Sequence, residues 1–298
     1  MTGANSGLGL ETATALAAHG ARVLMACRNQ EKAAEALRRV REVATGPAPE
    51  VVTLDLADLE SVRVASETLV DTEGRLDLLV NNAGVMALPL RRTPQGFEMQ
   101  FGTNHLGHFA LTGRLLPLLA RPVTARVVTL SSAAHRIGRM RWDDLSWQHG
   151  YRKWLAYGQS KLANLLFMSE LDRRARAHST ARAGDGLVSV AAHPGYASTH
   201  LQAAGPEMMG NRLMSSMMDA ANRVFAQSAE HGARPTLYAA TMPDVQGGAF
   251  YGPDGPGEMR GHPKEVKPSG SARNEADAAR LWEVSQELTG VSFDWSAV

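Results

Sequence analysis

The strongest constraint on the fold of this 298-residue chain is a regular alternation of short apolar runs with longer helical patterns. The short runs predict strands at 21–26, 51–54, 76–80, 126–130, 187–192 and 249–251. The longer runs predict helices at 9–19, 30–44, 59–72, 101–119, 157–176 and about 274–288. Strands that alternate with helices favour a parallel sheet, and right-handed crossovers place helices on both faces. We therefore expect an α/β fold built on a doubly wound, Rossmann-type sheet.

We expect a single domain over residues 1–298, because α/β folds of this length are often one domain and no repeat or long linker interrupts the chain. Hydrophobic residues make up 44% of the sequence, which is enough for a sizeable core. Residues 139–155 separate the fifth strand from the next helix, and residues 252–270 read as a loop rich in glycine and proline. Residues 199–225 are rich in methionine, which adapts to irregular apolar partners, so they are a candidate substrate lid. An ordinary helix packed on the core is the alternative.

The charge balance and the single cysteine exclude several classes of protein. The 31 basic and 30 acidic side chains give a net charge of +1, without the clustered basic charge of a nucleic-acid surface. Cys27 has no partner for an internal disulfide, which fits a reducing compartment. No apolar run approaches the roughly 20 residues of a membrane span, and the N-terminus lacks the pattern of a signal peptide. We therefore expect a cytoplasmic protein.

A glycine-rich turn near the N-terminus predicts a phosphate-binding site. Glycines spaced GxxxGxG let the backbone turn tightly and approach a pyrophosphate closely. The helix that follows offers free N–H groups and the positive end of its dipole to such an anion. A purely structural turn between a strand and a helix is the alternative. The residues expected to contact the cofactor in this turn are Gly3, Asn5, Ser6, Gly7, Leu8 and Gly9.

A strand ordinarily precedes such a turn, but here Met1 directly precedes Thr2. The first, central strand of the sheet is therefore expected to be missing, which would leave backbone groups of its neighbours unpaired. Our hypothesis is that the start site was assigned late or that the sequence is truncated. Mass spectrometry of the native protein tests this, and a natural N-terminus at Met1 would contradict it.

The ends of the following strands indicate NADP(H) as the cofactor. NAD-binding folds place an acidic residue on the ribose about 20 residues after the turn, whereas the second strand here ends without one. Arg28 stands there instead, and its fork of N–H donors suits a 2′-phosphate; a solvated surface arginine is the alternative. Asp55 is expected to cap the adenine amino group. The other residues expected along the cofactor are Leu56, Asn82, Ala83 and Gly84.

Tyr157 and Lys161 are four residues apart and share one face of a helix. A lysine ammonium nearby favours phenolate and lowers the tyrosine pKa, so that Tyr157 can exchange a proton with a carbonyl or alcohol oxygen. Ser132 ends the fifth strand and is expected to hold the substrate oxygen, with Ser131 as the rival. Asn104 begins an apolar helix, where an N-cap is the alternative role. Each residue alone is weak evidence, and their joint order is strong evidence for a catalytic site.

Together these residues resemble the short-chain dehydrogenase/reductase family over essentially the whole chain. Within the family, the sequence is most similar to the branch of the retinol dehydrogenases, WW-domain oxidoreductase and light-dependent protochlorophyllide reductase. The supporting strings are TGANSGLG, ACRN, NNAGVM, NHLGHFALT, LSSAAH, YGQSKLANLLF and HPGYAST.

The resemblance implies a role for each site residue. It makes Tyr157 the acid/base and Ser132 the group that positions the substrate oxygen, and it supports Ser132 over Ser131. It has Lys161 also bond the nicotinamide ribose and Asn104 hold a water in a proton relay. It further implies contacts with the nicotinamide from Pro194, Gly195 and Thr199.

The resemblance implies an NADP(H)-dependent oxidoreductase that interconverts a carbonyl and an alcohol on a mainly apolar small molecule. The expected partner is that small molecule, and a homo-oligomer is a possible assembly. One alternative is a catalytically inactive dinucleotide-binding regulator, which would be expected to lack Tyr157 or Lys161. Another is reduction of a carbon–carbon double bond, but that branch uses a cysteine near the substrate and Cys27 sits by the adenine end. His105 and His108 lack accompanying acidic ligands, so no metal site is expected and a core role is favoured.

Overall fold

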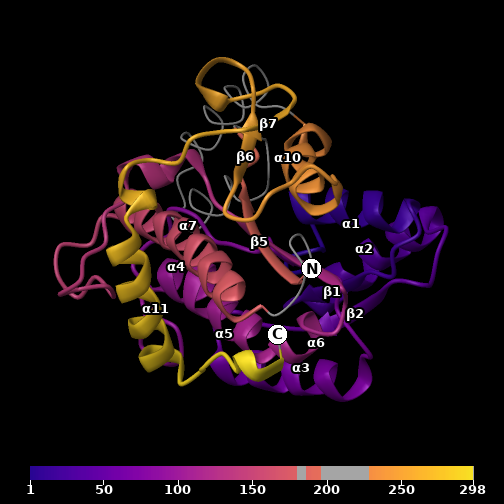
Figure 1. Cartoon of the computed structure of the whole chain (residues 1–298), viewed down its shortest axis with the longest axis horizontal. Coiled ribbons are helices and arrows are strands. Elements are labelled where there is room, and N and C mark those ends of the chain that lie inside the picture. Colours follow the sequence, from indigo (N-terminus) through magenta and orange to yellow (C-terminus); the bar gives the residue numbers. More distant parts are fainter. Residues whose placement is uncertain (180–185, 196–227, 298) are drawn as a thin grey trace.

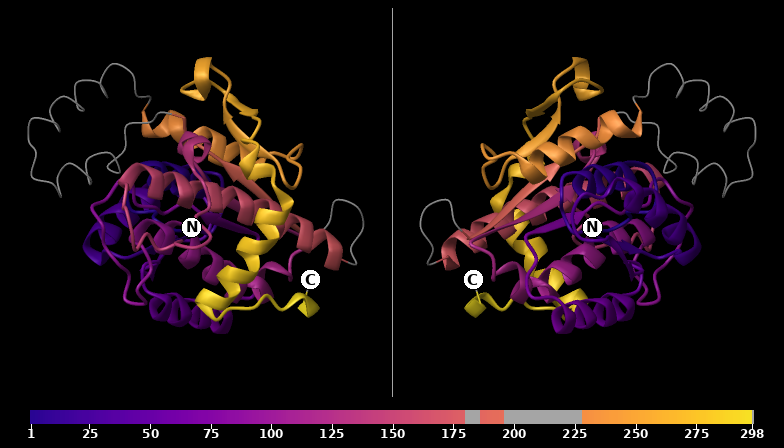
Figure 2. Two further views of the ribbon diagram at one scale, coloured as in Figure 1. Left: turned by 90° about the vertical axis from the view of Figure 1, so that its left-hand side faces the viewer. Right: turned by 90° about the vertical axis from the view of Figure 1, so that its right-hand side faces the viewer.

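The computed structural model describes residues 1–179, 186–195 and 228–297. Helices cover both faces of a central, mainly parallel sheet, as Figures 1 and 2 show from three sides. The predicted α/β architecture is therefore confirmed. The candidate lid at 199–225 and Thr199 lie outside the described residues.

The sheet consists of two groups of strands. β1 pairs with β2, and the second group has the order β3-β4-β5-β6-β7. All pairs are parallel except the antiparallel pair of β6 and β7. The strands are β1 (Leu24–Cys27), β2 (Glu50–Thr53), β3 (Leu78–Asn81), β4 (Thr124–Leu130), β5 (Gly186–Ala192), β6 (Phe250–Pro253) and β7 (Pro263–Glu265).

Each strand predicted from the apolar runs is present, shifted by a few residues at most. The expectation that 252–270 forms only a loop is wrong, because β7 lies within this segment and pairs with β6. A three-residue strand that begins at a proline carries too short a pattern to be recognised from periodicity.

Met1 and Thr2 lie between the two groups of strands, at the place of the strand that the sequence analysis expects to be missing. The Ala26 amide donates to Met1 O (2.8 Å), and the Thr2 amide donates to Val80 O (3.0 Å). The Gly3 amide then donates to Ala26 O (2.8 Å). Two residues thus pair with the ends of both β1 and β3, and they fix where the glycine-rich turn leaves the sheet.

The helices form two layers. Helices α1, α2 and α10 lie on one face of the sheet, and α3, α5, α7 and α11 lie on the other (Figure 1). The longer helices are α1 (Gly7–Ala18), α2 (Gln30–Val43), α3 (Leu59–Thr72), α5 (Gly107–Arg114), α7 (Lys153–His178), α10 (Ala229–Thr241) and α11 (Glu275–Thr289). Side chains that accept hydrogen bonds from first-turn amides begin four of them, namely Asn29 at α2, Asp58 at α3, Ser228 at α10 and Asn274 at α11. Helix α10 was not predicted, and Pro235 in its interior is a residue that normally argues against a helix.

The single helix predicted at 101–119 is wrong. The chain instead forms α4 (Met99–Phe101), a π-helical turn η1 (Gly102–Leu106), α5, and α6 (Leu116–Leu119). The break before α6 coincides with Pro117, which cannot donate a backbone hydrogen bond. At the start of α5, a Cβ on Gly107 would collide with the carbonyl oxygen of Leu56, so glycine is needed for this close approach.

A buried aromatic cluster joins α5, α7 and the C-terminal segment. The rings of Phe109 and Phe167 are 5.6 Å apart, and those of Phe109 and Trp282 are 5.2 Å apart. Phe293 packs on Trp282 at 4.4 Å between ring centres. The cluster closes the core on the face of the sheet that carries α7. Within the described ranges, no helix has the length and apolar character to cross a membrane.

Candidate active site

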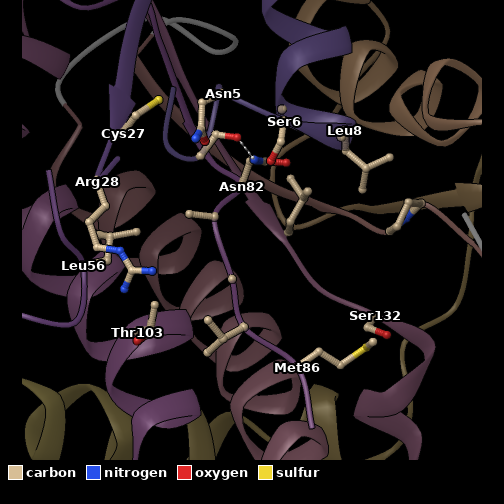
Figure 3. A pocket seen from close by; sticks show the side chains of 18 of the residues that line it. Asn5, Ser6, Leu8, Cys27, Arg28, Leu56, Asn82, Met86, Thr103 and Ser132 are labelled. Atoms are coloured by element: carbon tan, nitrogen blue, oxygen red, sulfur yellow. Dashed lines mark hydrogen bonds between the residues drawn. The ribbon is translucent and has the colours of Figure 1, made fainter. Parts of the chain in front are cut away.

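A cavity of about 580 Å³ opens where β1, β3, β4 and β5 end (Figure 3). Parallel strands bring their carboxyl ends to one edge of a sheet, which is where α/β proteins place their ligands. Ser132, Tyr157 and Lys161 line this cavity, whereas Asn104 does not. All the predicted cofactor residues that the structure describes also line it: Gly3, Asn5, Ser6, Gly7, Leu8, Gly9, Arg28, Asp55, Leu56, Asn82, Ala83, Gly84, Tyr157, Lys161, Pro194 and Gly195.

The glycine-rich turn leads into α1, whose first-turn amides have no partner within the helix. Gly3 and Gly7 have positive φ angles of 64° and 51°, a conformation that favours glycine. A Cβ on Gly9 would collide with Gly3 O, so this glycine lets the turn fold back onto α1. In the described structure, the Ser6 side chain makes no capping hydrogen bond, and the first turn of α1 holds no acidic residue. The first-turn amides of α1 and the helix dipole therefore fit a pyrophosphate.

Thr2 and Asn82 join this turn to the end of β3. Thr2 Oγ1 accepts hydrogen bonds from the amides of Asn82 (2.9 Å) and Ala83 (3.0 Å). Asn82 Nδ2 donates in return to Thr2 O (2.8 Å) and Gly3 O (3.3 Å). The two segments expected along the cofactor are thus held together as one unit.

His105 and His108 have the core roles favoured by the sequence analysis. His105 Nε2 lies 2.8 Å from Ser285 Oγ, and His108 Nε2 lies 2.9 Å from Thr2 Oγ1. Burial lowers the pKa of His105 to about 3 and that of His108 to about 4, so both are neutral. Among the described residues, no group of histidine, cysteine or acidic side chains is arranged to hold a metal ion.

Arg28 lies at the end of the cavity opposite Ser132 (Figure 3). Its side chain is 69% exposed and extends beside Leu56, with Nη1 3.7 Å from Asp55 Oδ2. An exposed ion pair of this length contributes little, so the guanidinium remains available to an anionic ligand. The other oxygen of Asp55 accepts from the Ala57 amide (3.0 Å). The glycine-rich turn and the Arg28 guanidinium both line the cavity, and together they fit the phosphates of a nicotinamide dinucleotide.

Tyr157, Lys161 and Ser132 converge from two elements. Tyr157 and Lys161 are buried one turn apart on α7, and the Lys161 Nζ lies 5.8 Å from the centre of the Tyr157 ring. Ser132 follows β4, begins the short 3-10 turn η2 (Ala133–Ile137), and hydrogen-bonds Tyr157. Lys161 Nζ also donates to Leu130 O (3.1 Å), at the end of β4. The arrangement places a hydroxyl pair and an amine at one end of the cavity.

The surroundings shift the pKa values of Tyr157 and Lys161 in the directions that favour their neutral forms. Burial raises the pKa of Tyr157 to about 12, although the hydrogen bond with Ser132 acts in the opposite direction. Burial lowers the pKa of Lys161 to about 8. The expected lowering of the Tyr157 pKa by the lysine charge is therefore not seen in this structure, because desolvation dominates and the opposing effect comes from the Ser132 hydrogen bond. At neutral pH Tyr157 carries its proton and can act as a proton donor.

The structure favours Ser132 over Ser131 for contact with a substrate oxygen. Ser131 Oγ donates to the main-chain oxygen of Lys161 (2.8 Å), which commits it to the helix behind the cavity. Ser132 instead faces Tyr157.

The alternative role of Asn104 as an N-cap is wrong, because Asn104 lies inside the π-helical turn. Its Oδ1 accepts from the Val85 amide (2.8 Å), and its Nδ2 donates to Val85 O and Ser160 Oγ (both 2.9 Å). The side chain sits behind Gly84, at which a Cβ would lie 3.2 Å from Asn104 Oδ1 and 3.5 Å from Lys161 Nζ. Its role in a proton relay stays a prediction.

Several residues that line the cavity were missed by the sequence analysis. Trp154 and Met86 are the most prominent of them, and the Trp154 ring stands edge-on to Tyr157 at 6.2 Å between ring centres. Trp154 is one helical turn before Tyr157, so an earlier start for this helix would have placed both on one face. Met86 follows the NNAG string, but side-chain direction in a loop leaves no periodic signal.

The sequence pattern of the short chain dehydrogenase family matches residues 1–209. The chain belongs to the short-chain dehydrogenase family. Members of this family are oxidoreductases that use a nicotinamide dinucleotide, and the resemblance stated from the sequence is confirmed.

Among curated relatives of this short-chain dehydrogenase, mouse retinol dehydrogenase 12 is 40% identical over 99% of the chain and 86% of its own length. A crystal structure of an uncharacterized protein of Mycobacterium paratuberculosis is 44% identical, with a TM-score of 0.78 over 98% of this chain and 93% of that one. An Escherichia coli CFT073 protein assigned as a short chain dehydrogenase, and solved in complex with NADPH, is 27% identical. Its TM-score is 0.54 over 71% of this chain and 80% of that one.

Proposed function

We propose that this short-chain dehydrogenase uses NADP(H) to interconvert a carbonyl and an alcohol on a mainly apolar small molecule. The observation that carries the proposal is the contact of Ser132 with Tyr157 beside Lys161, at one end of a cavity that has Arg28 at the other. NADPH in the related Escherichia coli structure supports the choice of cofactor.

The nicotinamide cofactor supplies or accepts the hydride. For carbonyl reduction, Tyr157 donates its phenolic proton to the substrate oxygen while the carbonyl carbon gains the hydride. Ser132 holds that oxygen beside the phenol. Lys161 has a pKa of about 8, so it is an ammonium at neutral pH, and its charge stabilises the phenolate left on Tyr157. Alcohol oxidation runs the same proton transfer in reverse.

The lining of the cavity supports an apolar substrate. Met86 and Trp154 lie at the end that holds Ser132 and Tyr157, and they offer a thioether and an indole face to a ligand. Figure 3 places Cys27 beside Arg28, at the opposite end. The proposal therefore keeps carbonyl chemistry ahead of double-bond reduction assisted by a cysteine.

Tyr157→Phe tests the proton-transfer role. We expect kcat for NADPH-dependent carbonyl reduction to fall by about 10²–10⁴-fold, the usual contribution of a positioned acid. The Kd for NADPH should stay within about twofold, because the phenyl ring keeps the packing. Stopped-flow absorbance and fluorescence titration measure the two quantities over a panel of retinoid, steroid and aliphatic carbonyls. Tyr238→Phe, which removes an exposed hydroxyl, is the matched control. Unchanged kcat in Tyr157→Phe would refute the assignment.

Arg28→Ala tests the choice of cofactor. Losing charge-assisted hydrogen bonds to a 2′-phosphate should raise the KM for NADPH by about tenfold or more and leave the KM for NADH nearly unchanged. Arg38→Ala, which removes another exposed positive charge from the same half of the molecule, controls for a general electrostatic effect. Equal increases for both cofactors in Arg28→Ala would contradict the 2′-phosphate role.

A further inference from the structure

Residues 85–88 follow Gly84, and Val85 and Met86 of this segment line the cavity. We call the segment the wall, and its backbone is anchored on both sides of Met86. Before Met86, the Asn104 side chain bonds both the N–H and the C=O of Val85 (2.8 and 2.9 Å). After it, the Ala87 amide donates to Gln100 Oε1 (2.7 Å), and Ala87 has a positive φ of 50°. A non-glycine residue in this conformation persists only where its surroundings hold it. Figure 3 shows the Met86 side chain directed toward Ser132.

Gln100 connects this wall to the helix that carries Tyr157. Its side chain is fully buried, and Nε2 donates to Lys153 O (3.0 Å) and to the Tyr151 hydroxyl (3.0 Å). Lys153 is the first residue of α7, directly before Trp154 and one turn before Tyr157. One amide group therefore holds Ala87 with its oxygen and the start of α7 with its nitrogen.

Tyr151 completes the network from the insertion between β4 and α7. Its hydroxyl donates to Leu88 O (2.8 Å) and also lies 3.2 Å from Glu98 Oε1. Glu98 is fully buried, and its Oε2 accepts from the Phe101 amide (2.8 Å). Burial raises the pKa of Glu98, whereas the hydrogen bonds from the Phe101 amide and the Tyr151 hydroxyl act in the opposite direction. The polar groups that meet here are thus mutually satisfied, as a rigid buried network requires.

We propose that Gln100 is a positioning residue for the end of the cavity that holds Ser132 and Tyr157. It fixes Met86 in its orientation toward Ser132, and it fixes the position of the wall relative to Tyr157. The effect on catalysis rests on the proposed function. The hydrogen bonds by which Gln100 joins Ala87 to Lys153, which we call the clamp, do not depend on it. Met86 then sets how much room an apolar substituent has beside the reacting carbonyl. A shorter side chain at Met86, or a loosened wall, admits longer substituents.

The catalytic test uses straight-chain aldehydes of increasing length with NADPH. Met86→Ala should move the preference toward longer chains, and Gln100→Leu should move it in the same direction. Gln100→Leu should also lower kcat/KM by about tenfold or more, with the Kd for NADPH within about twofold. Tyr151→Phe keeps the Gln100 bonds to Ala87 and Lys153, so it serves as the milder second variant if Gln100→Leu folds poorly. Gln159→Leu is the matched control, because this buried glutamine bonds Leu145 O (2.8 Å) rather than the wall.

Hydrogen–deuterium exchange tests the clamp independently of any activity. Gln100→Leu should speed exchange in peptides covering both 83–92 and 151–157, since both segments lose a hydrogen-bond partner. Gln159→Leu should leave 83–92 unchanged. Faster exchange in both segments supports the inference even if the wild-type protein reduces none of the aldehydes, a result that would count against the proposed function alone. Two results would overturn the inference. One is an exchange rate at 83–92 in Gln100→Leu equal to that of the wild-type protein, and the other is an unchanged chain-length preference in a Gln100→Leu variant that is active.

Discussion

Tyr157 and Lys161 lie one turn apart on α7 in surroundings that exclude water, and both are driven toward their neutral forms. A tyrosine whose pKa is about 12 keeps its proton at neutral pH, and it needs a nearby cation only once that proton has left. Lys161, with a pKa of about 8, supplies the cation over the physiological range and loses it at higher pH. The two residues therefore have separate pH dependences.

The pH profile of carbonyl reduction should report Lys161. Because its pKa is lowered, the ammonium is present below about pH 8 and lost above it, so kcat/KM should be flat at low pH and fall above about pH 8. Lys161→Arg keeps a positive charge throughout this range, so the fall should disappear whatever the variant's absolute rate. Initial rates from about pH 6 to 10 measure both profiles. An identical fall in Lys161→Arg would mean that another group titrates.

Helix α7 and the turn η2 approach each other through two glycines, which brings Ser132 to Tyr157. A Cβ on Gly138 would collide with Gly158 O, and a Cβ on Gly158 would lie 2.9 Å from Ala134 O. Gly158 directly follows Tyr157, and η2 directly follows Ser132. The close crossing of these two elements therefore determines the distance between the Ser132 and Tyr157 hydroxyls.

Gly138→Ala should separate the two elements. Overpacking of this kind typically costs about 1–3 kcal/mol of folding free energy. We expect kcat to fall by about tenfold or more with the Kd for NADPH nearly unchanged, since the glycine-rich turn is not involved. Gly74→Ala is the control, because nothing lies within 4 Å of a Cβ added there. If Gly138→Ala and Gly74→Ala have the same kcat, the crossing of η2 and α7 does not set the distance between the Ser132 and Tyr157 hydroxyls.

The C-terminal segment completes the core through side chains that do not line the cavity. Phe293 packs against Trp282 of α11 and Phe109 of α5, and a Cβ on Gly113 would lie 2.8 Å from the Phe293 ring. None of these residues lines the cavity. Stability and cofactor binding should therefore be separable in the molecule as a whole.

Phe293→Ala should lower the free energy of unfolding by about 3–5 kcal/mol, the usual cost of removing a buried aromatic ring. The Kd for NADPH of the folded protein should not change. Urea unfolding followed by tryptophan fluorescence, together with NADPH titration below the transition, checks both statements. Val123→Ala is the surface control, since that side chain is 75% exposed. A large loss of NADPH affinity would show that the core and the cavity are coupled.

The alternation of apolar runs was sufficient to predict the layered sheet and the strands that compose it, because burial on both faces imposes that pattern on the residues. The sequence likewise predicted the glycine-rich turn from the spacing of its glycines. It also predicted that Ser132, Tyr157 and Lys161 lie together, because Ser132 follows a strand end and the other two share one helix face. The breaks in 101–119 were not predicted. They depend on contacts with Leu56 and on a π-helical turn, which leave no periodic signal in the residues.

Local residue chemistry thus specified the family and the fold, and it predicted most of the residues that the structure brings together at the cavity. Tertiary structure alone decided how those residues behave. Desolvation set the pKa values of Tyr157 and Lys161 against the trend expected from charge. The fold also brought Gln100 from α4 between the wall at Ala87 and the start of α7. Both results depend on which groups lie next to each other in space and on how much water they exclude, and neither quantity is encoded in local sequence spacing.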